Sequence, residues 1–227
     1  MRRAISLIAL AIGTGCTAPD PRNEAVTGMS ADQPHSFSAD VWADNWFSLS
    51  VDGVQVAEDS VPITTERSFN AESFTFPAKR PFVLGLIVKD FKANDSGLEY
   101  IGTPRQQMGD GGVILQVFDE TGTLVAATDA NWKCLVTHHA PLDKSCAQEQ
   151  NPIAGEGACG FETLPEPEGW NTLGFDASSW PDATVHSAAD VRPKDGYDRI
   201  DWNSAAKIIW GPDLETDNTL LCRFVVE

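Results

Sequence analysis

Apolar and polar residues alternate in several short stretches of the chain, which is the pattern of a β-strand with one buried face. In residues 47–51, Phe, Leu and Val alternate with Ser. Asp52-Gly53 follows, and this pair predicts a two-residue hairpin turn because a type I′ turn needs positive φ at both central positions. Residues 54–56, with Val at each end, begin the return strand, and we expect the rest of the chain to pack on this hairpin.

Further stretches continue this pattern. Residues 82–88 are apolar on both faces, as in a central strand that lies between two layers. Residues 113–118 and 124–127 are apolar strands on either side of a predicted turn. Pro77 is expected to end an alternating strand at residues 73–76, because proline has no N–H to donate to a neighbouring strand.

The last predicted strand covers residues 220–226, and its apolar side consists of Leu220, Cys222, Phe224 and Val226. No stretch of ten or more residues has a helical period. Short strands separated by turns predict an all-β sandwich or barrel, and nothing within residues 36–227 has the composition of a second linker. We therefore expect residues 36–227 to form a single domain.

The N-terminus has the order of an export signal. Residues 1–3 are positively charged, and residues 4–12 are apolar but too short to span a bilayer. Small residues then precede Cys16, as in a bacterial lipobox, although Gly13 stands where an aliphatic residue is usual. We expect residues 1–15 to be a signal peptide and Cys16 to be lipidated, with simple secretion as the alternative. Residues 16–35 are polar without apolar periodicity and are expected to be a flexible tether.

The formal net charge is −17. Such a charge argues against nucleic acid as a partner, which needs a basic surface, and against adsorption to anionic lipid. We therefore expect contact with a membrane only through the N-terminal lipid anchor. The predicted location is the bacterial cell envelope, either the periplasm or the outer membrane, and secretion remains the alternative.

Four cysteines follow Cys16, namely Cys134, Cys146, Cys159 and Cys222. An even number in an exported chain predicts disulfides, because exported proteins fold in an oxidising compartment. Zinc is the competing interpretation, but no two of these cysteines have the separation typical of zinc ligands. Three pairings are open, and we favour Cys134–Cys146 together with Cys159–Cys222. Residues 137–169 then form a long excursion pinned by the cysteines.

Three phrases in the chain resemble, in order, the galactose-binding-like jelly-roll domains that accompany bacterial α-L-rhamnosidases and related glycoside hydrolases. They are Ala43-Asp44-Asn45 ahead of the Asp52-Gly53 turn, Thr128-Asp129-Ala130-Asn131-Trp132-Lys133, and Gly169-Trp170 with Phe175-Asp176-Ala177-Ser178-Ser179-Trp180-Pro181-Asp182-Ala183. The resemblance covers about residues 40–185 and implies a jelly-roll β-sandwich similar to many carbohydrate-binding modules. In those enzymes the domain is an accessory, so the resemblance supplies no catalytic residue.

One departure from the family concerns the C-terminus. Residues 206–212 and 218–224 resemble the opening strand of the family but stand at the end of this chain. We hypothesise that the jelly roll is circularly permuted, with the last strand in the place of the usual first strand. This hypothesis would be wrong if residues 220–226 lay outside the sheet beside the first hairpin.

Candidate ligand-binding residues lie at the start of the first predicted hairpin. Trp46 shares the polar face of its strand with Ser48, and an indole on such a face can stack on a pyranose ring. We take Asn45, Trp46 and Ser48 as the candidates; the alternative is that this face packs under a second layer. Three other tryptophans are expected to pack the core edges, namely Trp132, Trp170 and Trp180.

Candidate metal ligands cluster between the strands at 82–88 and 113–118. Asp90, Asp95, Glu99 and Asp110 supply the hard oxygen ligands that calcium prefers. Domains of the resembling kind often carry a structural calcium ion, so calcium is the candidate cofactor. The competing interpretation is a chance cluster, because the chain has 33 acidic residues and no regular calcium-loop spacing.

The sequence lacks a Gly-x-Ser-x-Gly nucleophile elbow, a His-Glu-x-x-His zinc motif and a phosphate-binding loop. We therefore expect a non-catalytic envelope protein that binds a glycan or presents a surface to another envelope protein. One alternative is a small periplasmic glycoside hydrolase with carboxylates in a cleft between residues 89–112 and 137–169. Two facing acids about 5–10 Å apart would favour it. A purely structural module is the other alternative.

Overall fold

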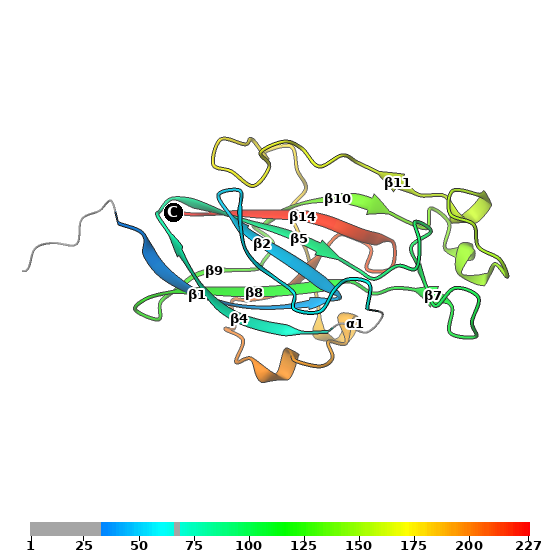
Figure 1. The fold of residues 1–227 in the computed structure, drawn as a ribbon, viewed down its shortest axis with the longest axis horizontal. Coiled ribbons are helices and arrows are strands. Elements are labelled where there is room, and N and C mark those ends of the chain that lie inside the picture. The colour runs from blue at the N-terminus through cyan, green and yellow to red at the C-terminus, as the bar shows by residue number, and fades with distance from the viewer. Residues whose placement is uncertain (1–32, 66–68) are drawn as a thin grey trace, which may run out of the picture. The chain divides into compact units, whose positions relative to one another are not determined.

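A computed structural model describes residues 33–65 and 69–227 of the chain. The predicted signal peptide, Cys16 and most of the predicted tether lie outside the described residues. From Pro34 onward the chain forms one compact unit of two antiparallel sheets that pack face to face (Figure 1). The all-β sandwich predicted from the alternating pattern is confirmed.

The first sheet, sheet A, has the order β12-β13-β8-β1-β4, and β9 also pairs with β8. Its strands are β1 (His35–Asp44), β4 (Ala71–Ala78), β8 (Gly112–Asp119), β9 (Leu124–Ala127), β12 (Thr184–His186) and β13 (Ile208–Trp210). The prediction that Pro77 ends a strand is wrong, since β4 continues to Ala78. Strand β4 is last in the order of its sheet, where a missing N–H leaves no partner unsatisfied.

The second sheet, sheet B, has the order β11-β10-β14-β5-β2-β3. Its strands are β2 (Trp46–Val51), β3 (Val54–Glu58), β5 (Phe82–Lys89), β10 (Lys133–His139), β11 (Glu162–Thr163) and β14 (Asp217–Val226). The chain crosses between the sheets after each strand or hairpin. A separate small hairpin joins β6 (Leu98–Glu99) to β7 (Gln107–Met108). The helical elements are short: α1 (Ala188–Val191) and the 3₁₀ helices η1 (Lys144–Gln148), η2 (Gly157–Cys159) and η3 (Tyr197–Arg199).

The predicted hairpin at residues 46–58 is confirmed. Val51 pairs with Val54, and Asp52 and Gly53 have φ values of 48° and 82°, as a type I′ turn needs. Strand β14 lies in the same sheet, with only β5 between it and β2. This is the placement that a circular permutation requires; the permutation itself stays a prediction.

The core lies between the two sheets and consists of the alternating apolar side chains of each strand. Phe47, Leu49 and Val51 on β2 meet it, as do Leu220 and Val226 on β14. Burying each such side chain contributes about 1.5–3 kcal/mol of hydrophobic free energy. The face assignments made from the sequence for β2 and β14 are therefore confirmed.

The outer faces of the sheets are also partly covered. Residues 164–183 lie over sheet B and bury Trp170 and Trp180 against Leu221, and the segment around η3 lies over sheet A beside Trp42 (Figure 1). Both indoles are buried, as expected for structural tryptophans. Trp132, also buried, stacks on Phe224 with ring centroids 5.4 Å apart in the core between the sheets. These layers explain why the long irregular segments stay folded without regular strands.

The disulfide pairing differs from the favoured one. The bonds are Cys134–Cys222 and Cys146–Cys159. Cys134 and Cys222 face each other directly in the register of β10 and β14, with Cα atoms 4.1 Å apart, and this pairing depends on strand order that spacing does not reveal. Two disulfides are typical of a protein that folds in an oxidising compartment outside the cytoplasm.

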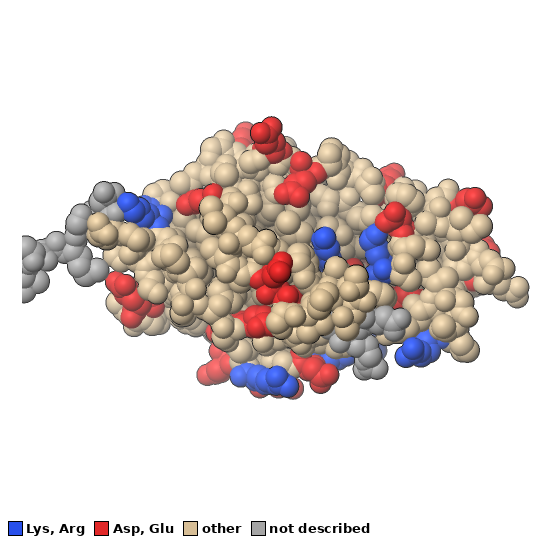
Figure 2. Space-filling model, in the orientation of Figure 1, with Lys and Arg blue, Asp and Glu red and all other residues tan. Residues whose placement is uncertain are grey.

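No helix within the described ranges is both long and apolar enough to cross a membrane. On the face drawn in Figure 2, acidic side chains are spread over the surface and basic side chains are fewer. The negative charge on this face is therefore distributed, as in a solvated surface, rather than gathered in one patch.

Candidate functional site

A polar pocket lies at the end of the sandwich where β1 ends and β8 begins. Its volume is about 290 Å³. We call it the carboxylate pocket because three acidic residues line it. Among the described residues, its lining is Asp44, Asn45, Phe69, Glu99, Tyr100, Arg105, Gln107, Asp110 and Lys194.

Strand ends from both sheets position the base of this pocket. Asp44 is the last residue of β1 and pairs in register with Gly112 of β8. Asn45 then crosses to sheet B, where its N–H donates to Lys89 O at 3.0 Å and its Oδ1 accepts from the Phe91 N–H at 2.6 Å. Asp90 follows β5, and its N–H donates to Asn218 O at 2.9 Å. The crossing from one sheet to the other therefore brings two buried carboxyl groups together.

The β6–β7 hairpin supplies a second wall. Glu99 and Gln107 are partners in its register, and Gln107 Nε2 donates to Glu99 Oε2 at 2.8 Å. Both residues line the pocket, but Glu99 is buried whereas Gln107 is exposed. This hydrogen bond fixes the Glu99 carboxylate by a side chain that itself lines the pocket.

The glycines that follow β7 let the backbone approach the buried groups closely. A Cβ built on Gly109 would lie 1.9 Å from Asp90 Oδ2, and one built on Gly111 would lie 2.1 Å from Trp210 Cε2. Neither position has room for a side chain. The glycine-rich segment ahead of β8 is therefore explained by packing, and it places Asp110 at the pocket.

Burial raises the pKa of the Asp44 carboxyl well above its usual range, and the negative charges of Asp110 and Glu99 raise it further, while Lys194 opposes them. Burial likewise raises the pKa of Asp90, with Asp44, Glu99 and Asp110 acting in the same direction. Asp44 is 1% exposed and Asp90 2% exposed, and the Oδ2 atom of each has no hydrogen-bond partner. Two carboxyl groups are thus held in a buried site where the neutral form is favoured.

Asp110 is partly buried, and burial raises the pKa of its carboxyl although Lys194 and Arg192 act in the opposite direction. The two basic side chains that line the pocket among the described residues, Arg105 and Lys194, lie over aromatic rings. Arg105 Cζ is 4.2 Å from the centroid of Tyr100, and Lys194 Nζ is 4.4 Å from that of Phe69. Cation–π contacts of this kind hold the charged groups at the rim.

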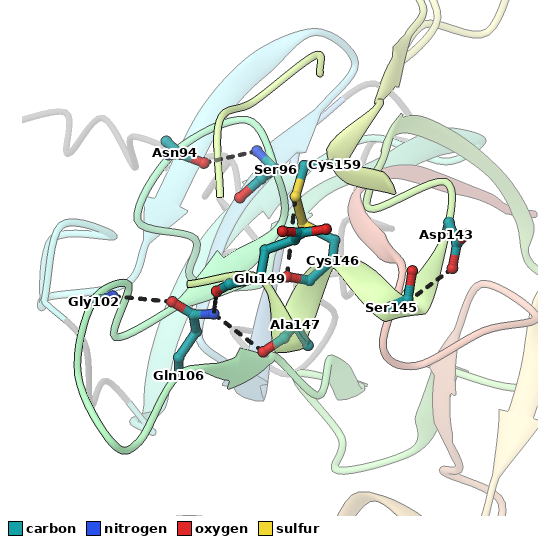
Figure 3. The surroundings of a disulfide bond; sticks show 10 residues. All are labelled: Asn94, Ser96, Gly102, Gln106, Asp143, Ser145, Cys146, Ala147, Glu149 and Cys159. Atoms are coloured by element: carbon teal, nitrogen blue, oxygen red, sulfur yellow. Dashed lines mark hydrogen bonds between the residues drawn. A yellow bond between two sulfur atoms is a disulfide. The ribbon is translucent and has the colours of Figure 1, made fainter. Parts of the chain in front are cut away.

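The loop that carries Tyr100 and Arg105 is fastened to the Cys146–Cys159 region, as Figure 3 shows. Gln106 Nε2 donates to Ala147 O at 3.1 Å and to Glu149 O at 2.8 Å, and its Oε1 accepts from the Gly102 N–H at 3.0 Å. The disulfide joins η1 to η2. It therefore supports one side of the pocket through Gln106.

Three of the four predicted metal ligands come together. Asp90, Glu99 and Asp110 lie near one another and near Asp44, as their mutual effects on the pKa values indicate. Asp95 lies elsewhere: Lys92 lowers its pKa, and its Oδ1 is 3.5 Å from His138 Nε2. Within residues 33–65 and 69–227, no group of three or more His, Cys, Asp or Glu residues has the arrangement of a metal site. Calcium binding stays a prediction.

The three predicted ligand-binding residues do not share one site. Asn45 lines the carboxylate pocket, whereas Trp46 and Ser48 lie on the outer face of sheet B. Lys89 Nζ lies 5.0 Å from the centroid of Trp46, and Ser48 is only 8% exposed. Asn45 follows β1 and precedes β2, so its side chain belongs to the crossing between sheets rather than to the strand face.

The cleft expected between residues 89–112 and 137–169 is present beside this pocket. A second cavity of about 540 Å³ is lined by residues of both segments, among them Gln106 and Gln148. It shares Gln107, Asp110 and Lys194 with the carboxylate pocket. The two cavities thus form one recessed region at this end of the sandwich.

Sequence reasoning did not find several residues of the pocket. Asp44 stood in one of the quoted phrases but was not singled out; Phe69, Tyr100, Arg105, Gln107 and Lys194 had no local signal. The glycine-rich run ahead of β8 was the one usable sign, because it marks a close approach of the backbone to other groups.

Comparison with known proteins adds no relative. No protein-family model matches the chain, no curated protein matches it, and no solved structure matches it. The resemblance to galactose-binding-like domains therefore stays a prediction carried by the quoted phrases.

Proposed function

We propose that this protein binds carbohydrate in the carboxylate pocket and does so without catalysis. The observation that carries the proposal is Asp44: a buried carboxyl with an unpartnered Oδ2 atom that lines a polar pocket of about 290 Å³. A buried polar atom without a hydrogen-bond partner lowers the stability of the free protein. A ligand that donates a hydrogen bond to this atom would remove that cost, which favours binding.

The chemistry of the lining favours a polyhydroxylated ligand. Carboxylate oxygens accept hydrogen bonds from hydroxyl groups, and the Gln107 amide both donates hydrogen bonds to hydroxyl groups and accepts them. A volume of about 290 Å³ is near the lower end of small-molecule pockets, as suits one or two sugar rings. The resemblance to carbohydrate-binding modules points the same way, by analogy of fold alone.

Export and anchoring complete the proposal. The two disulfides fit folding outside the cytoplasm, and the N-terminal pattern supports a signal peptide with lipidation at Cys16. The protein would then display its pocket on the cell envelope. We expect the wild type in the membrane fraction and a Cys16→Ser variant in the soluble fraction. If the variant and the wild type appeared in the same fraction, lipid anchoring would be contradicted.

A glycan array tests carbohydrate binding, run once with calcium and once with chelator. We expect binding to a defined class of sugar, and a two- to tenfold loss of affinity in Gln107→Ala, about the effect of one hydrogen bond. Gln55→Ala is the matched control, because Gln55 lies on β3 and contacts Glu58. Loss of binding in chelator would support calcium. No binding in either condition would contradict the proposal and favour a structural role.

The second candidate function is glycoside hydrolysis, favoured by the same buried acid. A carboxyl whose pKa is raised well above its usual range can protonate a leaving group, and Glu99 and Asp110 line the same pocket as further carboxylates. Turnover of aryl glycosides by the wild type, abolished in Asp44→Asn, would support this function. Binding without turnover would favour the first proposal.

A further inference from the structure

We propose that the carboxylate pocket selects sugars that carry a free primary ammonium group, with Asp44 as the residue that pairs with it. This inference rests on the proposed carbohydrate binding and adds the class of ligand. Its starting point is the side chain of Asp44, which lies at the end of β1, lines the pocket and has a buried Oδ2 atom without a hydrogen-bond partner.

Among the described residues, more acidic than basic groups act on Asp44. Acidic groups face it from three other elements: Asp90 after β5, Glu99 on β6 and Asp110 ahead of β8. In the part of the chain that the structure describes, the basic groups that line the pocket are Arg105 and Lys194, and the charge of Lys194 lowers the pKa of Asp44. These two lie over the rings of Tyr100 and Phe69, at 4.2 Å and 4.4 Å, and the Asp44 Oδ2 atom accepts no hydrogen bond from either.

An ammonium group matches this arrangement better than the neutral groups of a sugar. It carries three N–H donors and a positive charge, so it satisfies the Asp44 carboxylate and offsets the neighbouring acids together. An N-acetyl group in the same place is neutral and bulkier, and its single N–H donor gives a weaker hydrogen bond to the carboxylate.

Binding is also expected to release a proton. Burial and the charges of Asp110 and Glu99, opposed by Lys194, raise the pKa of the Asp44 carboxyl in the free protein, whereas pairing with an ammonium ion lowers it. The proton of the Asp44 carboxyl passes to solvent as the ion pair forms. Affinity for the amine therefore rises with pH as Asp44 ionises, until the amine of the ligand itself loses its proton.

Titration calorimetry with matched ligands tests the inference. The probes are glucosamine oligosaccharides and their N-acetylated counterparts of the same length, measured in two buffers of different ionisation enthalpy. We expect the wild type to bind the free amine at least about tenfold more tightly and to release a proton as it binds. In Asp44→Asn, whose side chain keeps the shape of Asp44, we expect the preference and the proton release to be lost.

Asp182→Asn is the control, since Asp182 is exposed and pairs with Lys133 away from the pocket. It should keep both the preference and the proton release. Equal affinity of the wild type for the two ligand forms would overturn the ammonium inference while supporting sugar binding. No affinity for any sugar on the array would overturn the proposed function itself. Because the comparison of ligands uses the wild type, it stands even if Asp44→Asn does not fold.

Discussion

The core between the sheets and the carboxylate pocket at their end are built on opposite principles. In the core, apolar side chains from β2, β5 and β14 interlock, and the Cys134–Cys222 bond joins two neighbouring strands. In the pocket, Asp44 and Asp90 are equally buried but have oxygen atoms without partners. Burial stabilises the first region and costs free energy in the second. The difference indicates that the core carries the stability, whereas the buried carboxyl groups of the pocket region reduce it.

Removing the disulfides should give the largest effects and separate the two regions. Cys134→Ala/Cys222→Ala opens a link across 88 residues and should lower the free energy of unfolding by about 4–5 kcal/mol. Cys146→Ala/Cys159→Ala opens one across 13 residues and should cost about 3 kcal/mol. Denaturant unfolding measures both.

Ligand affinity should respond in the reverse order. The Cys146–Cys159 bond supports the loop of Tyr100 and Arg105 through Gln106, so its loss should weaken binding at temperatures where the domain stays folded. The core bond has no such contact with the pocket. A larger loss of affinity in the folded Cys134→Ala/Cys222→Ala variant would contradict the separation of the two regions.

Gly109→Ala should have the next largest effect, about 1–3 kcal/mol, because the added Cβ would lie 1.9 Å from Asp90 Oδ2 and must push the loop away. Gly174→Ala is the matched control, since a Cβ at that position meets no atom within 4 Å. Thermal unfolding of the two variants measures the difference. Equal melting temperatures would show that the loop accommodates a side chain and that the close approach is not required.

The same contrast explains what could be predicted from the sequence. Strands β2 and β14 were predicted because alternation depends only on which face is buried, and the hairpin turn depends on two local residues. Strands β5 and β8 were predicted from short runs of apolar residues, which are also a local signal. The pocket depends on contacts across long separations, such as Lys194 with the ring of Phe69 and Gln106 with the carbonyl oxygen of Glu149. The disulfide pairing failed for the same reason: Cys134 meets Cys222 because β10 neighbours β14.

The pH dependence of stability should report the buried acids. The pKa of Asp44 is raised in the folded state, so between the usual range of an aspartate and this raised value the folded protein holds a proton that the unfolded chain has lost. Stability conferred by the neutral form is therefore lost as the pH rises through that window. The free energy of unfolding should fall less steeply with pH in Asp44→Asn than in the wild type.

Other groups titrate in the same range and are common to both proteins. Burial raises the pKa of Asp59 to about 6, which acts in the same direction as Asp44. Burial lowers the pKa of His138 to about 4, which acts in the opposite direction because the unfolded chain takes up the proton first. The difference between the two proteins reports Asp44 together with its effect on the pKa of Asp90. Identical pH profiles would contradict a raised pKa of Asp44 in the folded state.

The smallest effect on the free energy of unfolding is expected for a carboxyl that, unlike Asp44, is exposed and has an ion-pair partner. The Asp182 side chain is 66% exposed and pairs with Lys133 on the surface. Asp182→Asn should change the free energy of unfolding by about 0–1 kcal/mol, because water screens an exposed ion pair and two long side chains lose freedom to form it. A change as large as that of Gly109→Ala would contradict the energetic contrast between surface carboxyls and buried ones. An exposed carboxyl would then contribute as much to the free energy of unfolding as the packing around the buried Asp90.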